Sequence, residues 1–144
     1  MNMTKKLLLT GLTALLLSIT SLGAYDLKSN MLQLNSELSK VQKAFLISDQ
    51  EGVKESITEF AKHAQDLLGN KEKFQTMLPK DKQHKVNSAV IAAQIIEHNV
   101  QIILDAINNK YQESGRIRRE KSQVAYTYIE DACFRCHNVV RDNY

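Results

Sequence analysis

The chain has 144 residues, of which 43% are hydrophobic and 24% are charged, and its formal net charge is +3. A charge this close to balance gives no electrostatic support for nucleic-acid binding. The length allows one domain with one hydrophobic core, and a single proline and no tryptophan leave few interruptions to helices.

Residues 1–24 have the pattern of a secretory signal peptide. Lys5 and Lys6 precede an apolar run over residues 7–22, and small residues follow. Cleavage would leave residues 25–144 as one domain and would lower the formal charge from +3 to +1, because both lysines are removed. The pattern predicts export across the bacterial inner membrane to the periplasm, and an uncleaved membrane anchor is the alternative.

Two amphipathic helices are predicted next. Between them, Ser48 to Glu51 have the Ser-x-x-Glu form of a capping box, so the second helix should begin near Asp49, and Gly69 should end it. In both helices apolar residues recur at spacings of three and four, which places them on one face: Leu27, Met31, Leu34, Leu38, Val41 and Phe45 in the first, and Val53, Ile57, Phe60, Ala64 and Leu67 in the second.

Residues 69–85 form the least regular stretch. Basic residues exceed acidic ones there, which is typical either of a solvated loop or of a docking surface for an acidic redox partner. Three apolar residues in the stretch could fold inward. The basic residues are Lys71, Lys73, Lys80, Lys82 and Lys85, the acids are Glu72 and Asp81, and the apolar residues are Phe74, Met77 and Leu78.

Two further helices complete the chain, separated by Ser114 and Gly115, and the second of them runs from about Arg116 past His137. Four helices with short connections predict an all-α fold, an antiparallel up-down-up-down four-helix bundle. The predicted core residues are Ala89, Ala93, Ile96, Val100, Ile103, Ile107 and Tyr111 in the third helix, and Ile117, Val124, Tyr128 and Ala132 in the fourth.

The segment Cys133-Phe134-Arg135-Cys136-His137 has the Cys-x-x-Cys-His form that attaches c-type haem. Each thiol adds across one vinyl group of the porphyrin, and the histidine ligates the iron from one face. On a helix, residues three and four apart share a face. Cys133, Cys136 and His137 are therefore predicted to bind one haem c covalently, with His137 as the proximal iron ligand.

Three other interpretations of the two cysteines are less well supported. A catalytic dithiol normally lies in a strand–helix–strand setting, and no strand pattern is visible. A zinc site needs four ligands, whereas the chain has only two cysteines. A disulfide would leave the adjacent histidine without a role.

Met31 is the best candidate for a second axial ligand. In the predicted topology, the start of the first helix and the end of the fourth lie at the same end of the bundle. Counted at ~1.5 Å per residue, Met31 and His137 reach similar depths. Methionine also fills cores, so plain packing is the alternative for Met31. His63 is a weaker candidate ligand, and His84 and His98 are expected at a helix end and on the surface.

Together these features resemble the cytochrome c′ family, the class II c-type cytochromes. The resemblance rests on a secreted chain of this length, four helices and a C-terminal Cys133-x-x-Cys136-His137, followed four residues later by a basic residue, Arg141. It implies that Met31 stands where low-spin members have a distal methionine. Those members often have a basic residue four positions earlier, where this chain has Leu27. The resemblance also allows a homodimer through the first two helices.

The expected function is single-electron transfer in the periplasm, with redox proteins as partners and no enzymatic activity. A histidine and a methionine on the iron would raise its reduction potential and leave no open position for a substrate. The alternative is a five-coordinate haem protein that binds NO or CO, with Met31 only packing beside the iron. A helical bundle without haem is the interpretation from a different functional class.

Overall fold

The computed structural model describes the backbone of residues 21–141 and the side chains from Asp26 onward. Of the predicted signal peptide, residues 1–24, only the last four residues fall in this range, as the first turn of α1. The described residues form helices and connections without strands, which confirms the all-α class. The elements are α1 (Ser21–Leu46), α2 (Gln50–Leu68), α3 (Lys71–Met77), a 3₁₀ turn (Gln83–Lys85), α4 (Asn87–Ile107) and α5 (Gly115–Val140).

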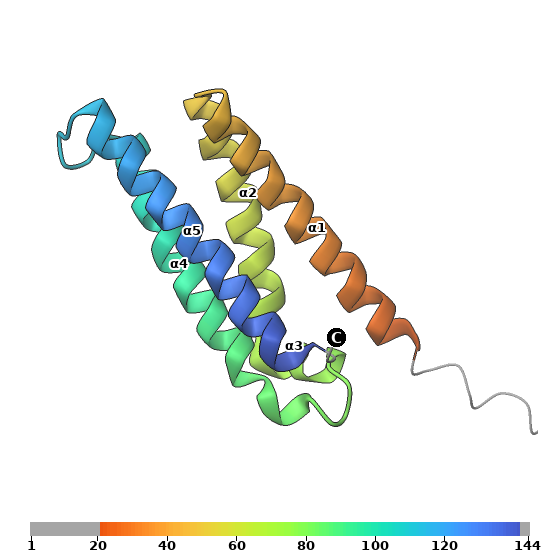
Figure 1. Ribbon diagram of the computed structural model, residues 1–144. Helices are drawn as coiled ribbons and strands as arrows, with labels where there is room; N and C mark the ends of the chain where they lie inside the picture. The colour runs from red at the N-terminus through yellow and green to blue at the C-terminus, as the bar shows by residue number, and fades with distance from the viewer. Residues whose placement is uncertain (1–20, 142–144) are drawn as a thin grey trace, which may run out of the picture.

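The four long helices lie side by side, and each runs opposite to the long helix before it (Figure 1). α1 packs on α2, α2 on α4, and α4 on α5. α1 and α5 lie farther apart on the remaining side (Figure 1). They are bridged there by Tyr126, whose ring meets Phe45 edge-on with 5.8 Å between centroids and whose hydroxyl donates to the Leu38 carbonyl at 3.5 Å.

The predicted core faces of α1 and α2 are confirmed. All five predicted core residues of α2 are buried, and those of α1 are either buried or packed against the core. α1 also buries Glu37, which no apolar pattern indicates. One carboxylate oxygen of Glu37 lies 2.5 Å from Nδ1 of His63 and 3.1 Å from Nε2 of Gln33. These contacts engage only one oxygen of the buried carboxyl group, and the other oxygen has no hydrogen-bond partner among the described residues.

The α1–α2 turn corrects the capping prediction. The second helix does begin next to Asp49, but the N-cap is Asp49 itself, whose carboxylate accepts from the Gly52 N–H at 2.9 Å. Ser48 has a φ of 58° and belongs to the turn. The Ser-x-x-Glu pattern is therefore coincidental, because the aspartate one residue later caps the helix. Gly69 ends α2 as predicted.

Asp49→Ala should lower the free energy of unfolding by ~1 kcal/mol, the usual cost of losing an N-cap side chain. Ser48→Ala is the matched control, because it changes the adjacent residue and removes no cap hydrogen bond, and it should have a smaller effect. Urea denaturation of both variants measures the difference. A larger loss in Ser48→Ala than in Asp49→Ala would restore the capping box.

α4 buries most of its predicted stripe, which fits its position between α2 and α5. By length and composition the segment Gln83–Ile107 is apolar enough to cross a membrane, and 39% of its most apolar window is buried inside the molecule. Tyr111 was predicted as a core residue, but it lies beyond the end of α4 and is 61% exposed. The helix ends earlier than the pattern indicates, at Ile107.

The predicted core face of α5 is largely wrong. Ile117, Val124 and Tyr128 are exposed, and only Ala132 of the predicted stripe is buried. α5 carries two stripes with helical spacing, and spacing alone cannot say which one meets α4. The face of α5 that packs inward carries smaller and more polar side chains than the predicted face. Its residues are Ser122, Ala125, Tyr126, Ile129, Ala132, Cys136 and Val140.

The segment between α2 and α4 closes one end of the molecule, the end at which α5 finishes (Figure 1). α3 contacts α1, α2 and α4. Phe74 and Leu78 are buried and Met77 is half-buried against the core, so these three residues fold inward as predicted. The lysines of the segment remain exposed or half-buried.

Candidate functional site

The last turns of α5 carry Cys133, Cys136 and His137 close together on the helix. Cys136 is 5% exposed, and Cys133 and His137 are half-buried. The intervening residues face outward: Phe134 is 65% exposed, and Arg135 pairs with Asp131 one turn earlier at 2.6 Å. Because the cysteines are one turn apart, both sulfurs and the imidazole reach the same region.

That region is an open cleft with a volume of about 80 Å³, which we call the cysteine cleft. All four long helices contribute to its wall, and apart from the residues of α5 and Asn35 the lining is apolar. An apolar lining with a few polar groups is common in pockets that bind cofactors. The lining residues are Met31, Leu34, Asn35 and Leu38 of α1, Phe60 and Leu68 of α2, Ala92 and Ile96 of α4, and Cys133, Cys136 and His137 of α5.

Every residue predicted for the site therefore lines one cleft. Met31 is about a hundred residues from the cysteines in the chain, yet it lines the same cleft. Its side chain is half-buried and packs against the core. Ala92 of α4 also lines the cleft.

The other histidines lie elsewhere. His98 and His84 are exposed. His63 is absent from the cleft wall, and its Nδ1 is engaged by Glu37 at 2.5 Å. The geometry thus brings His137 alone among the four histidines to the cysteine cleft, and gives no support to a second axial histidine from α2.

Burial governs the protonation of the site. It raises the pKa of the Cys133 thiol to about 11, with smaller contributions from Cys136 and Glu130, and it raises the pKa of Cys136 to about 11. Burial, followed by the positive charge of Arg141, lowers the pKa of His137. In the haem-free chain both thiols are therefore protonated at neutral pH, and His137 keeps a free nitrogen lone pair, as an iron ligand must.

In the haem-free folded chain, Cys133 and Cys136 should be alkylated by iodoacetamide about 100-fold more slowly at pH 8 than in the urea-unfolded chain, since their pKa values are about two units above the usual 9. Because the thiol pKa values are higher in the folded chain than in the unfolded chain, the protonated thiols contribute to the stability of the folded state below pH 9. That contribution is lost as the pH rises toward 11. Equal rates in folded and unfolded chains would show that the thiols are not buried.

Two other uses of the cysteines can be compared with this geometry. Both thiols are free in the structure. Among the side chains that the structure describes, no three His, Cys, Asp or Glu residues converge into a group that could hold a metal ion by themselves. The described residues therefore offer no protein-only zinc site, whereas the cleft offers two thiols and an imidazole beside an apolar wall.

Sequence reasoning missed Asn35. Its exposed side chain lies at the edge of the cysteine cleft, one turn beyond Met31 on α1. A polar residue next to an apolar stripe gives no signal by itself, although its i+4 spacing from Met31 places it on the same face.

Comparison with known proteins adds no relative: no protein-family model, no curated protein and no solved structure matches this chain.

Proposed function

We propose that this chain is a periplasmic monohaem c-type cytochrome that transfers single electrons, folded as an antiparallel up-down-up-down four-helix bundle after removal of its signal peptide. The observation that carries the proposal is the convergence of Met31, Cys133, Cys136 and His137 on one apolar cleft. Four helices separated in sequence supply the wall of that cleft, so the Cys-x-x-Cys-His motif has a pocket beside it as well as the right spacing.

The residues of the cleft fit a haem. The thiols of Cys133 and Cys136 would hold it covalently, and His137 would ligate the iron from α5. Leu34, Phe60 and Ile96 are among the apolar residues that would cover the porphyrin and exclude water. Bound there, haem supplies an iron that cycles between the ferric and ferrous states.

Met31 is the proposed second axial ligand. It approaches the cleft from α1, a helix other than the one that carries His137. A thioether is a soft ligand that favours ferrous iron and therefore raises the reduction potential. With both axial positions filled, the site would exchange electrons with little rearrangement and would offer no position for a substrate.

The segment between α2 and α4 is the proposed contact for redox partners. It lies at the end of the molecule where α5 presents the cysteines (Figure 1). Lys71, Lys73 and Lys80 are exposed on it. An acidic partner would be steered to this end, so its association rate should fall as ionic strength rises.

Expression of the full chain with a c-type haem maturation system tests the proposal. A pyridine haemochrome spectrum that persists after acid–acetone extraction, from protein recovered in the periplasmic fraction with the mass of the mature chain plus one haem, would support it. The haem should also titrate reversibly with one electron. Mature protein without covalent haem would overturn the proposal in favour of a helical bundle of another function.

A second candidate is a five-coordinate haem protein that binds NO or CO. The observation that favours it is Asn35, whose side chain accompanies Met31 on the cleft wall and has amide donors that suit a bound gas. Ready CO binding by the ferrous protein, with a high-spin spectrum, would select this candidate over electron transfer.

A further inference from the structure

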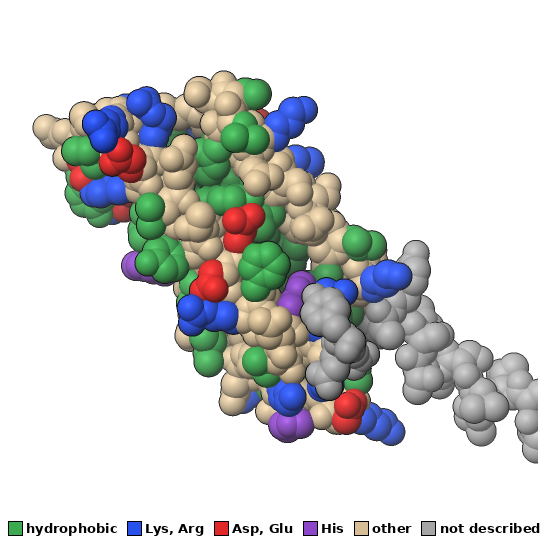
Figure 2. All heavy atoms as spheres, in the orientation of Figure 1, with side chains coloured by type: hydrophobic (Ala, Val, Ile, Leu, Met, Phe, Trp, Pro, Cys, Tyr) green, Lys and Arg blue, Asp and Glu red, His purple; other side chains and the backbone are tan. Residues whose placement is uncertain are grey.

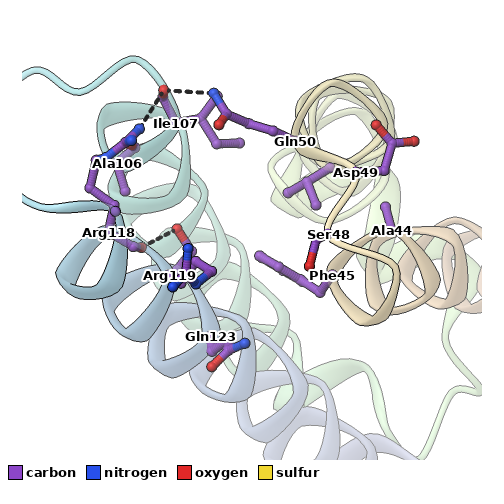
Figure 3. Close-up of a pocket in the computed structure, with 13 residues that line it drawn as sticks. Ala44, Phe45, Ser48, Asp49, Gln50, Ala106, Ile107, Arg118, Arg119 and Gln123 are labelled. Atoms are coloured by element: carbon purple, nitrogen blue, oxygen red, sulfur yellow. Dashed lines mark hydrogen bonds between the residues drawn. The ribbon is translucent and has the colours of Figure 1, made fainter.

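A second cavity lies at the other end of the molecule, between the α1–α2 turn and the start of α5 (Figure 3). We call it the arginine cavity, after Arg118 and Arg119 in its wall. Its volume is about 150 Å³, and none of its lining residues belongs to the cysteine cleft. Phe45 and Val53 form part of an apolar side.

Arg118 lies in the cavity wall, and one of its hydrogen-bond donors has no partner among the described residues. One terminal nitrogen of its guanidinium lies 3.4 Å from the Ala106 and Ile107 carbonyl oxygens at the end of α4. Its Nε is buried and has no hydrogen-bond partner among the described residues. A buried donor without an acceptor is unfavourable, and the positive charge of this guanidinium has no acidic partner among the described residues.

Arg119 carries a positive charge that no acidic side chain among the described residues neutralises. Its side chain is exposed and lines the cavity, and within the described residues it has no ion pair or hydrogen bond. Its neighbours differ: Arg116 pairs with Glu120, and Lys121 pairs with Glu113. Lys and Arg side chains gather at this end of the molecule (Figure 2).

The acidic residue in the wall does not neutralise this charge. Asp49 is committed to capping α2 through the Gly52 N–H at 2.9 Å, and its carboxylate points away from the cavity (Figure 3). The cavity therefore combines positive charge, an unpartnered buried donor and an apolar side, the features that favour a small anion with an apolar group.

We propose that the arginine cavity binds a small soluble organic anion, a phosphate monoester or a carboxylate, with its charged group on the guanidinium groups of Arg118 and Arg119 and its apolar group against Phe45 and Val53. The proposal does not depend on haem, because the cavity and the cysteine cleft share no residue.

Calorimetric titration of the purified protein with phenyl phosphate, with or without bound haem, tests this site. Arg119→Gln should weaken binding about tenfold, the loss expected for one charge-assisted hydrogen bond. Arg116→Gln is the matched control, because it removes the same charge from the same turn of α5 but from a residue paired with Glu120, and it should change affinity less than about twofold. Neutral benzyl alcohol should bind more weakly than phenyl phosphate.

Three results would overturn the proposal. The first is the absence of binding at millimolar phenyl phosphate. The second is an equal loss of affinity in the two variants, which would indicate only the general positive field of this end. The third is binding to vesicles of anionic phospholipid without binding of phenyl phosphate, which would identify a membrane surface as the source of the anion. Circular dichroism of both variants verifies that they fold.

Discussion

Replacing Cys133 and Cys136 together by alanine should abolish covalent haem attachment. Both sulfurs line the cysteine cleft, and each is expected to form one thioether bond. After coexpression with the maturation system, the double variant should give no haemochrome spectrum in the extracted polypeptide, and its mass should equal that of the mature chain alone. Each single variant should keep one attachment point and a reduced yield of haem.

Phe134→Ala is the matched control for this experiment. Phe134 lies between the two cysteines but is 65% exposed and does not line the cleft. Its replacement should leave the attached haem and its spectrum unchanged. Covalent haem in the double cysteine variant would contradict the assignment of these two thiols, and loss of haem in Phe134→Ala would show that the segment tolerates no change.

Met31→Leu should remove the proposed sulfur ligand of the haem iron and should preserve the packing of α1. Leucine has a similar volume but no sulfur to ligate iron. The oxidised protein should lose the weak long-wavelength band of sulfur–iron ligation. Its reduction potential should fall by on the order of 100 mV, a fraction of the ~0.8 V range that axial ligands span. The ferrous form should gain CO binding.

Leu32→Ala is the control for changes in α1 as a helix. Leu32 is adjacent to Met31 but 61% exposed, so this variant should keep the parent spectrum and potential. If Met31→Leu instead leaves the spectrum, the potential and CO binding unchanged, methionine only packs beside the iron. That outcome would discard electron transfer through a six-coordinate site and select the gas-binding candidate.

The sequence determined the helices and the chemistry of the motif, because both depend on residues close together in the chain. Spacings of three and four placed Val53, Ile57 and Phe60 correctly in the core of α2. The Cys-x-x-Cys-His spacing put two thiols and an imidazole within one turn. Two helix ends were not predicted correctly. Asp49 rather than Ser48 is the N-cap of α2, and α4 ends before Tyr111.

Only the tertiary structure decided which faces meet. α5 has two apolar stripes, and its contact with α4 buried Ala125 and Ile129 while it left Val124 and Tyr128 exposed. The burial of Glu37 depends on His63 from another helix. The cysteine cleft likewise depends on tertiary structure, because all four long helices supply its wall. Spacing along one helix cannot specify such contacts, since burial depends on which neighbour covers each face.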